Sequence, residues 1–519
     1  MAERAVTITP VWPGLGAAAG VAALILAALV AVALRAETGA GLGAGDVAAI
    51  RFTLLQAALS AVVSVAIAIP LARALARRRF AGRRALITLL GAPFILPVIV
   101  AVMGFLVVFG RAGWVNLALG TVGVAPLSIY GLHGVVLAHV FFNLPLATRL
   151  ILQGWQDVPA EQFRLAAQLG AGPGDIARLI ERPILRRVVP GALAVVFAIC
   201  LTSFAVALTL GGGPRATTIE LAIYQAFRFD FDMGRASLLG GLQIMLTLGA
   251  ACLALWSTRG RNWSGAGLDR PVERWDAAHW MLRVQDAGLV LLAAGFLILP
   301  LAAIVVAGLP GLARLPNAVF MSAGFSLAVA LASTLTMLCL ALPMALAAAQ
   351  GRVGAELAGL LGLAVSPLVI GTGLFILLYP LADPFALALP VTALVNALMA
   401  LPFALRILIP PVREVLGTQG KLAVSLNMSG WPFFRLVLLP RLRGPLGFAT
   451  GLSAALSMGD LGVIALFADP ELATLPLQIF RLRGAYQIDA AAGASLLLLV
   501  LSMGVFWLCD RGGRSHVAD

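Results

Sequence analysis

Twelve long apolar segments alternate with short polar connections, and this alternation restricts the fold more than any other feature. The segments lie near residues 14–35, 52–76, 86–109, 131–152, 188–210, 236–256, 285–308, 318–349, 357–380, 387–409, 445–467 and 488–508. A helix needs roughly 20 apolar residues to cross the hydrocarbon core of a bilayer. The sequence therefore predicts an all-α polytopic membrane protein with about twelve transmembrane helices.

The charges support this prediction and suggest an orientation. The chain is 61% hydrophobic and 11% charged, against about 25% charged residues in soluble domains. If the N-terminus is inside, 27 of the 36 Lys and Arg residues fall in inside loops. Because basic residues accumulate on the cytoplasmic side, we expect both termini in the cytoplasm. The net charge of +13 then reflects orientation, and no nucleic-acid partner is implied.

A pattern of helix and loop occurs twice in the chain. Leu-Pro steps end at Pro145 and Pro402, and later prolines lie at Pro183 and Pro440, each pair 257 positions apart. We expect a first repeat at 1–258, a cytoplasmic linker at 259–284 and a second repeat at 285–519. Six helices per repeat is an even number, so the repeats should be parallel and related by an axis along the membrane normal. Two similar loops on one side suit a two-fold partner.

The first of these loops, about 155–187, contains two short helical patterns. Pro159 can begin a helix whose first turn holds Glu161, and Ala166 and Ala167 form a small face. Glycines, including Gly170, then break the helix. A second pattern carries Arg178 on its polar face, and we expect Pro183 to end it.

The second loop, about 412–444, repeats the plan with other residues. Ala423 and Leu426 take the place of the small face, and Asn427 stands where the first loop has Gly170. Asn tolerates the left-handed backbone conformation, so an elbow over 427–430 is predicted. Arg435 and Pro440 complete the correspondence.

The connection that follows the fifth apolar segment has its own signals. Gly211, Gly212 and Gly213 are expected to form a flexible exit from a helix. Thr217 and Glu220 have the spacing of a capping box that opens a short helix, which includes Tyr224. These residues are candidates for a gate or for a surface that docks a binding protein, although an ordinary structured loop would look the same.

A few polar residues fall inside apolar segments. Asp460 lies in the eleventh segment, and its counterpart in the first repeat is Ser203. A carboxylate at the centre of a membrane helix costs about 2.5–3.5 kcal/mol, so Asp460 is a pathway candidate, with a helix-packing role as the alternative. Asn143 and Asn396 are predicted to donate interhelical hydrogen bonds. His133 and His139 have no carboxylate or cysteine companions, and no metal site is expected.

The first loop resembles the EAA–G–I–LP loop of binding-protein-dependent ABC importer permeases of type I. The matching residues are Glu161, Ala166, Ala167, Gly170, Ile180 and Pro183. The resemblance implies that each loop is a coupling loop that docks one of two copies of an ABC ATPase subunit. It also implies that ATP and Mg are bound by that partner and that this chain carries no cofactor. The second copy is degenerate, because it has Asn427 in place of the glycine.

Longer strings are similar to the thiamine/thiamine-pyrophosphate permeases of that family. They are residues 211–225, residues 130–145 and residues 459–467. This resemblance implies a bacterial inner-membrane subunit that translocates thiamine or its phosphates and works with a periplasmic thiamine-binding protein. Permeases for ferric iron share the architecture, so iron or another small solute remains an alternative.

Two other classes of transport protein, and a membrane enzyme, are disfavoured by the sequence. The single lysine, Lys421, follows Gly420 but precedes Leu422, so the phosphate-binding motif GxxxxGK[ST] is missing and the chain is not expected to be the ATPase. An ion-coupled secondary transporter with six plus six helices would be expected to use more intramembrane acids and bases than Asp460. No set of catalytic residues suggests a membrane enzyme.

Overall fold

The computed structural model describes residues 10–36, 41–91, 95–213, 216–258, 279–467 and 472–514. Within these ranges the chain forms helices and turns, and no strand occurs. Eleven helices are long and apolar enough to cross a membrane, or twelve if one bent pair counts as a span. The prediction of an all-α polytopic membrane protein is confirmed.

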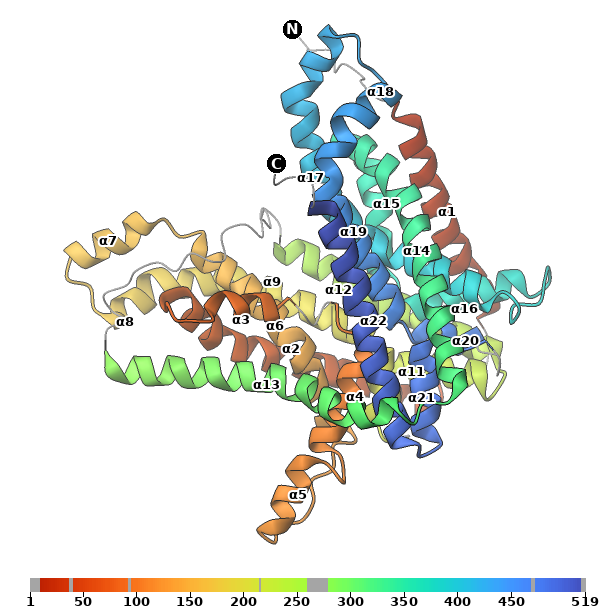
Figure 1. The fold of residues 1–519 in the computed structure, drawn as a ribbon, viewed down its shortest axis with the longest axis horizontal. Helices are drawn as coiled ribbons and strands as arrows, with labels where there is room; N and C mark the ends of the chain where they lie inside the picture. The colour runs from red at the N-terminus through yellow and green to blue at the C-terminus, as the bar shows by residue number, and fades with distance from the viewer. Residues whose placement is uncertain are drawn as a thin grey trace.

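The first half contains long helices and several short ones (Figure 1). Their bounds are α1 Trp12–Arg35, α2 Ala44–Arg77, α3 Arg83–Leu89, α4 Val98–Phe109, α5 Trp114–Thr121, α6 Leu132–Gln156, α7 Ala160–Gln168, α8 Pro173–Ile176, α9 Arg182–Leu201, α10 Phe204–Leu210, α11 Ile219–Arg228 and α12 Met233–Thr258.

The second half follows the same order with fewer interruptions. Its helices are α13 Trp280–Leu312, α14 Asn317–Ala349, α15 Val353–Ala364, α16 Pro367–Leu378, α17 Ala388–Ser425, α18 Trp431–Phe433, α19 Leu439–Gly459, α20 Gly462–Phe467, α21 Leu475–Gly484 and α22 Ile488–Arg514. The expected linker falls on residues 259–278, which lie outside the described ranges, and on the first turn of α13.

Several segments that looked continuous in the sequence are broken in the structure. The ninth apolar segment is two helices, α15 and α16, that meet at 97°. The fifth and eleventh segments break before Phe204 and before Gly462. Periodicity alone does not reveal such breaks, because both sides of each break remain apolar. Pro97 is the N-cap residue of α4, and Pro367 is the first residue of α16.

The first helix of each half also packs against helices of the other half. Helix α1 packs on α14, α15 and α16, and α13 packs on α2 and α4. The approach is close enough to require glycine: a Cβ at Gly373 would lie 2.3 Å from a backbone oxygen of α1, and one at Gly104 would lie 2.4 Å from a backbone oxygen of α13. The two halves are therefore interlocked.

Equivalent hydrogen bonds hold the short helices α11 and α21 in place. The hydroxyl of Thr53 on α2 accepts the N–H of Ile219 at 2.9 Å, and the hydroxyl of Ser326 on α14 accepts the N–H of Leu475 at 2.7 Å. A buried helix N-terminus needs such acceptors. The matching pairs show that the sequence duplication is also a structural one at this point.

The long helices of the two halves run in different directions and diverge toward the two loops (Figure 1). Helices α7 and α8 lie at the end of the first set, and α18 lies at the end of the second. Helices α11 and α21 lie on the opposite side, where the two sets converge.

Candidate functional site

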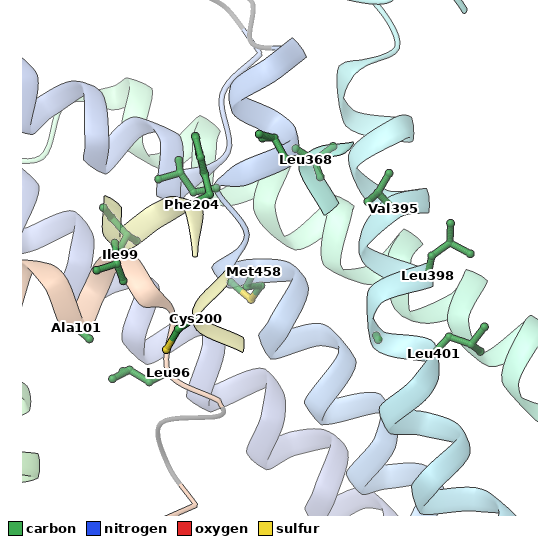
Figure 2. Close-up of a cluster of buried hydrophobic side chains, with 14 of the residues drawn as sticks. Leu96, Ile99, Ala101, Cys200, Phe204, Leu368, Val395, Leu398, Leu401 and Met458 are labelled. Atoms are coloured by element: carbon green, nitrogen blue, oxygen red, sulfur yellow. The ribbon is translucent and has the colours of Figure 1, made fainter. Parts of the chain in front are cut away.

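A cavity of about 400 Å³ lies where four helix breaks meet. Its lining comes from the segment before α4, from the α9–α10 break, from the start of α16 and from the α19–α20 break. Figure 2 shows Leu96, Cys200, Phe204, Leu368 and Met458 from these elements gathered in one region. A cavity of this size suits a small molecule, and helix breaks are tolerated within a membrane where they line a cavity.

Two carboxylates line this cavity. Asp460 lies in the α19–α20 break, where its Oδ1 accepts the N–H of Gly462 at 3.2 Å and its Oδ2 has no hydrogen-bond partner. Glu220 is 1% exposed, and its Oε1 accepts a hydrogen bond from Gln243 at 3.1 Å. None of the described lining residues is Arg or Lys. The cavity is therefore electrostatically suited to a cation.

His139, which the sequence did not indicate as a site residue, links the α9–α10 break to α2. The Nε2 atom of His139 lies 2.6 Å from the Ser203 hydroxyl, and its Nδ1 atom lies 3.1 Å from the Ser60 hydroxyl. The signal was present, because His139 is 257 positions before Asn396, which also lines the cavity.

The predicted asparagine roles are confirmed. Asn143 donates to the sulfur of Cys200 on α9 at 3.4 Å, and Asn396 donates to the Ser457 hydroxyl on α19 at 3.1 Å. His133 binds the carbonyl of Ser128. No group of three His, Cys, Asp or Glu side chains suited to a metal ion occurs among the described residues.

The capping box predicted for α11 was wrong. The cap is Thr218, whose hydroxyl accepts the N–H of Leu221 at 3.3 Å, and Thr217 is one residue too early. Glu220 turns inward instead and also accepts a hydrogen bond from Ser366, the cap of α16. It therefore joins the first half to the second beside the cavity.

Gly211, Gly212 and Gly213 follow the end of α10, as expected for an exit from a helix, and Gly211 and Gly212 are closely packed. A Cβ at Gly211 would lie 2.5 Å from the carbonyl oxygen of Ala207, and one at Gly212 would lie 2.9 Å from Tyr130. Gly212 and Gly213 also have positive φ angles of 79° and 126°. The contact of Gly212 with Tyr130 packs residues 211–225 against residues 130–145, two of the segments that resemble the thiamine permeases.

Tyr224 packs its ring edge-on against Phe204, which lines the cavity, at a centroid distance of 5.3 Å. Burial raises the pKa of Tyr224, and the charges of Arg228 and Arg481 partly offset this effect. Tyr224 stays a gate candidate through this contact.

The first loop is built as two arms and an elbow. Helix α7 holds Glu161, Ala166 and Ala167, and its only fully covered side chain among those described is Phe163. Gly170 then has a φ of +68°. Ala167 and Arg178 are exposed, and Ala166 is half-buried, so the loop offers a surface to a partner.

The second loop departs from the expected plan. Helix α17 continues without a break from Ala388 to Ser425, so the first arm is the end of a membrane helix. As a result Ala423 is only 4% exposed and is not available to a partner, whereas Leu426 and Arg435 are exposed. Asn427 has a φ of +54°, as predicted for its place in the elbow.

Pro183 and Pro440 do not end helices. Each lies in the first turn of the next membrane helix, directly after a π-helical turn of five residues, Ala177–Glu181 or Phe434–Leu438. Proline lacks an N–H and its ring clashes with the preceding turn, and the wider π-turn relieves both problems. Such turns are frequent at functional sites, and these two join the loops to the membrane helices.

The chain is similar over most of its length to known bacterial proteins. It is 40% identical over 461 residues to the thiamine transport system permease protein ThiP of Escherichia coli K12, and the match covers 85% of each chain. The protein of the same name from Brucella abortus strain 2308 is 40% identical over 450 residues, which are 84% of this chain and 82% of the relative. That of Haemophilus influenzae is 35% identical over 441 residues, covering 81% and 80%. No family model matches the chain.

Proposed function

Because this chain belongs to the family of thiamine transport system permease proteins, we propose that it is the permease subunit of an ATP-driven importer that moves thiamine from the periplasm to the cytoplasm. It is a multi-pass membrane protein and a transport subunit. In the proposed assembly it lies in the bacterial inner membrane with both termini in the cytoplasm.

The observation that carries the substrate proposal is the chemistry of the cavity. Thiamine is a cation with two aromatic rings. The cavity offers the carboxylates of Asp460 and Glu220 and the aromatic side chains of Phe142, Phe204 and Phe403, and no basic side chain lines it among the described residues. A cation over an aromatic face and near a carboxylate is stabilised by both.

The loops account for the use of ATP. Two copies of an ABC ATPase subunit bind ATP and Mg and contact the first loop at Glu161, Ala166, Ala167, Gly170, Arg178 and Pro183. They contact the second loop at Leu426, Asn427, Arg435 and Pro440, and Ala423 supports that surface from beneath. Closure of the ATPases brings the loops together and opens the other end.

The side opposite the loops receives a periplasmic thiamine-binding protein. On this side Gly211–Gly213 and Thr217 lie in the connection that leads to α11, and Glu220 joins the two halves through Ser366. Tyr224 and Ser203 lie between this connection and the cavity. The long helices diverge toward the loops (Figure 1), which supports a state open to the cytoplasm in which the periplasmic end is closed.

The test is uptake of labelled thiamine by liposomes that contain this chain, its ATPase subunit and an enclosed supply of ATP, with binding protein outside. Uptake that requires both ATP and the ATPase is expected. Equal uptake without the ATPase would overturn the proposal in favour of an ion-coupled secondary transporter.

Ferric iron is the second candidate substrate, because the same two carboxylates would also attract a metal cation. Competition in the same assay separates the two. An excess of unlabelled thiamine should abolish labelled uptake, whereas an excess of ferric iron should leave it unchanged.

A further inference from the structure

The two loops are joined to the membrane helices by different kinds of side-chain contact. In the first half, the end of α2 carries arginines whose partners come from two other elements. Arg73 Nε lies 3.0 Å from an oxygen of Glu181, the last residue of the π-turn between the first loop and α9. Glu181 is 4% exposed and the Arg73 side chain is 29% exposed, so this ion pair is partly shielded from water.

The next turn of α2 binds the first helix of the second half. Arg77 donates two hydrogen bonds to the carboxylate of Asp286 on α13, from Nε at 2.8 Å and from Nη2 at 2.6 Å. Arg78 adds a third at 2.6 Å. The side chains of Arg77 and Asp286 are 2% and 3% exposed. A planar guanidinium that meets a carboxylate in this way fixes both position and orientation.

Arg73 and Arg77 are four residues apart and therefore lie on one face of α2. That face connects the first loop, through Glu181, to α13, through Asp286. Since α13 packs along α2 and α4, a displacement of the first loop has a continuous path of charged contacts into a helix of the second repeat.

The second half lacks this path at the matching positions. Thr53 and Ser326 place α2 and α14 in register with an offset of 273, so Leu346 and Gln350 stand where the first half has Arg73 and Arg77. Leu438, at the position equivalent to Glu181, is fully buried. There a Cβ at Gly14 of α1 would lie 2.2 Å from a backbone oxygen of α14. None of Leu346, Gln350 and Leu438 carries a charge, so the ion pairs of the first half have no counterpart at these positions.

We propose that Glu181 is the positioning residue of the first loop, and that its pair with Arg73 transmits the movement of one ATPase subunit to α2 and, through Asp286, to α13. The inference rests on the proposed ATP-driven transport. It makes the two loops unequal: the first transmits through ion pairs and the second through packed apolar side chains.

The experiment measures thiamine uptake and ATP hydrolysis together in the reconstituted complex. Glu181→Gln and Arg73→Gln should each keep ATP hydrolysis within about twofold and lower the thiamine moved per ATP by about tenfold, a coupling effect of ordinary size. The double variant should be no worse than either single one, because both remove the same contact. Glu356→Gln, which removes an exposed carboxylate in the first turn of α15, serves as the matched control and should change neither quantity.

The outcomes separate the two proposals. If the unmodified complex shows no ATP-dependent uptake, the proposed function fails. If it does transport but the ratio stays unchanged in Glu181→Gln, or if the two single losses multiply in the double variant, the positioning role is wrong. If Glu181→Gln does not assemble, Arg73→Gln decides alone, because that side chain is 29% exposed and its loss is better tolerated.

Discussion

Replacement of Asp460 by asparagine tests the cation site most directly. The amide keeps the size of the side chain and its acceptor for the N–H of Gly462, but removes the charge. A sphere with the volume of the cavity has a radius of about 5 Å, and at that distance a unit charge pair contributes about 3 kcal/mol for an effective dielectric constant of 20. Desolvation of both charges offsets part of this energy.

We therefore expect Asp460→Asn to lower kcat/KM for thiamine uptake by roughly 10- to 100-fold, since about 1.4 kcal/mol corresponds to a factor of ten. ATP hydrolysis by the complex in the absence of substrate should persist, because Asp460 lies at the opposite end of the 21-residue helix α19 from the second loop. The assay is the initial rate of labelled uptake into proteoliposomes.

The matched control is Asp383→Asn, which removes an exposed carboxylate whose Oδ1 accepts the N–H of Phe385. It should transport normally. Uptake by Asp460→Asn at the unmodified rate, or an equal loss in Asp383→Asn, would refute the cation site.

The remaining predictions concern packing and the loops. Gly373→Ala should lower the midpoint of thermal unfolding in detergent, with overpacking of about 1–3 kcal/mol, whereas Gly20→Ala, whose added methyl group meets nothing within 4 Å, should not. Asn427→Gly should keep ATPase binding, while Asn427→Val should weaken it, because a β-branched residue is strained at a positive φ; affinity of the solubilised permease for the ATPase checks both. Ala167→Trp should leave the permease folded but block ATPase binding, since Ala167 is exposed, and Ala423→Trp should instead reduce thermal stability, since Ala423 is buried; a folded Ala167→Trp that still binds the ATPase would remove the first small face from the proposed contact.

The sequence predicted those features of the fold that depend on repetition. The apolar segments located the membrane helices. The offset of 257 linked Gly170 to Asn427, and in the structure both residues have the left-handed backbone conformation. The same offset pairs Ser203 with Asp460. These properties follow from local residue type and are visible without tertiary contacts.

Features set by tertiary packing could not be predicted in this way. Glu220 has the spacing of a capping residue, but its partners Gln243 and Ser366 come from other helices. Ala423 matches Ala166 in sequence, yet it is buried because α17 does not break. The exchange of α1 and α13 between halves depends on close glycine contacts that a single sequence does not pair.

The measurement that tests the central claim is the ATP dependence of thiamine uptake by the purified complex in liposomes, with and without the ATPase subunit. The account predicts uptake only when the ATPase, enclosed ATP and the binding protein are all present, and competition by thiamine but not by ferric iron. Uptake that continues without the ATPase, or that carries iron and not thiamine, would contradict it.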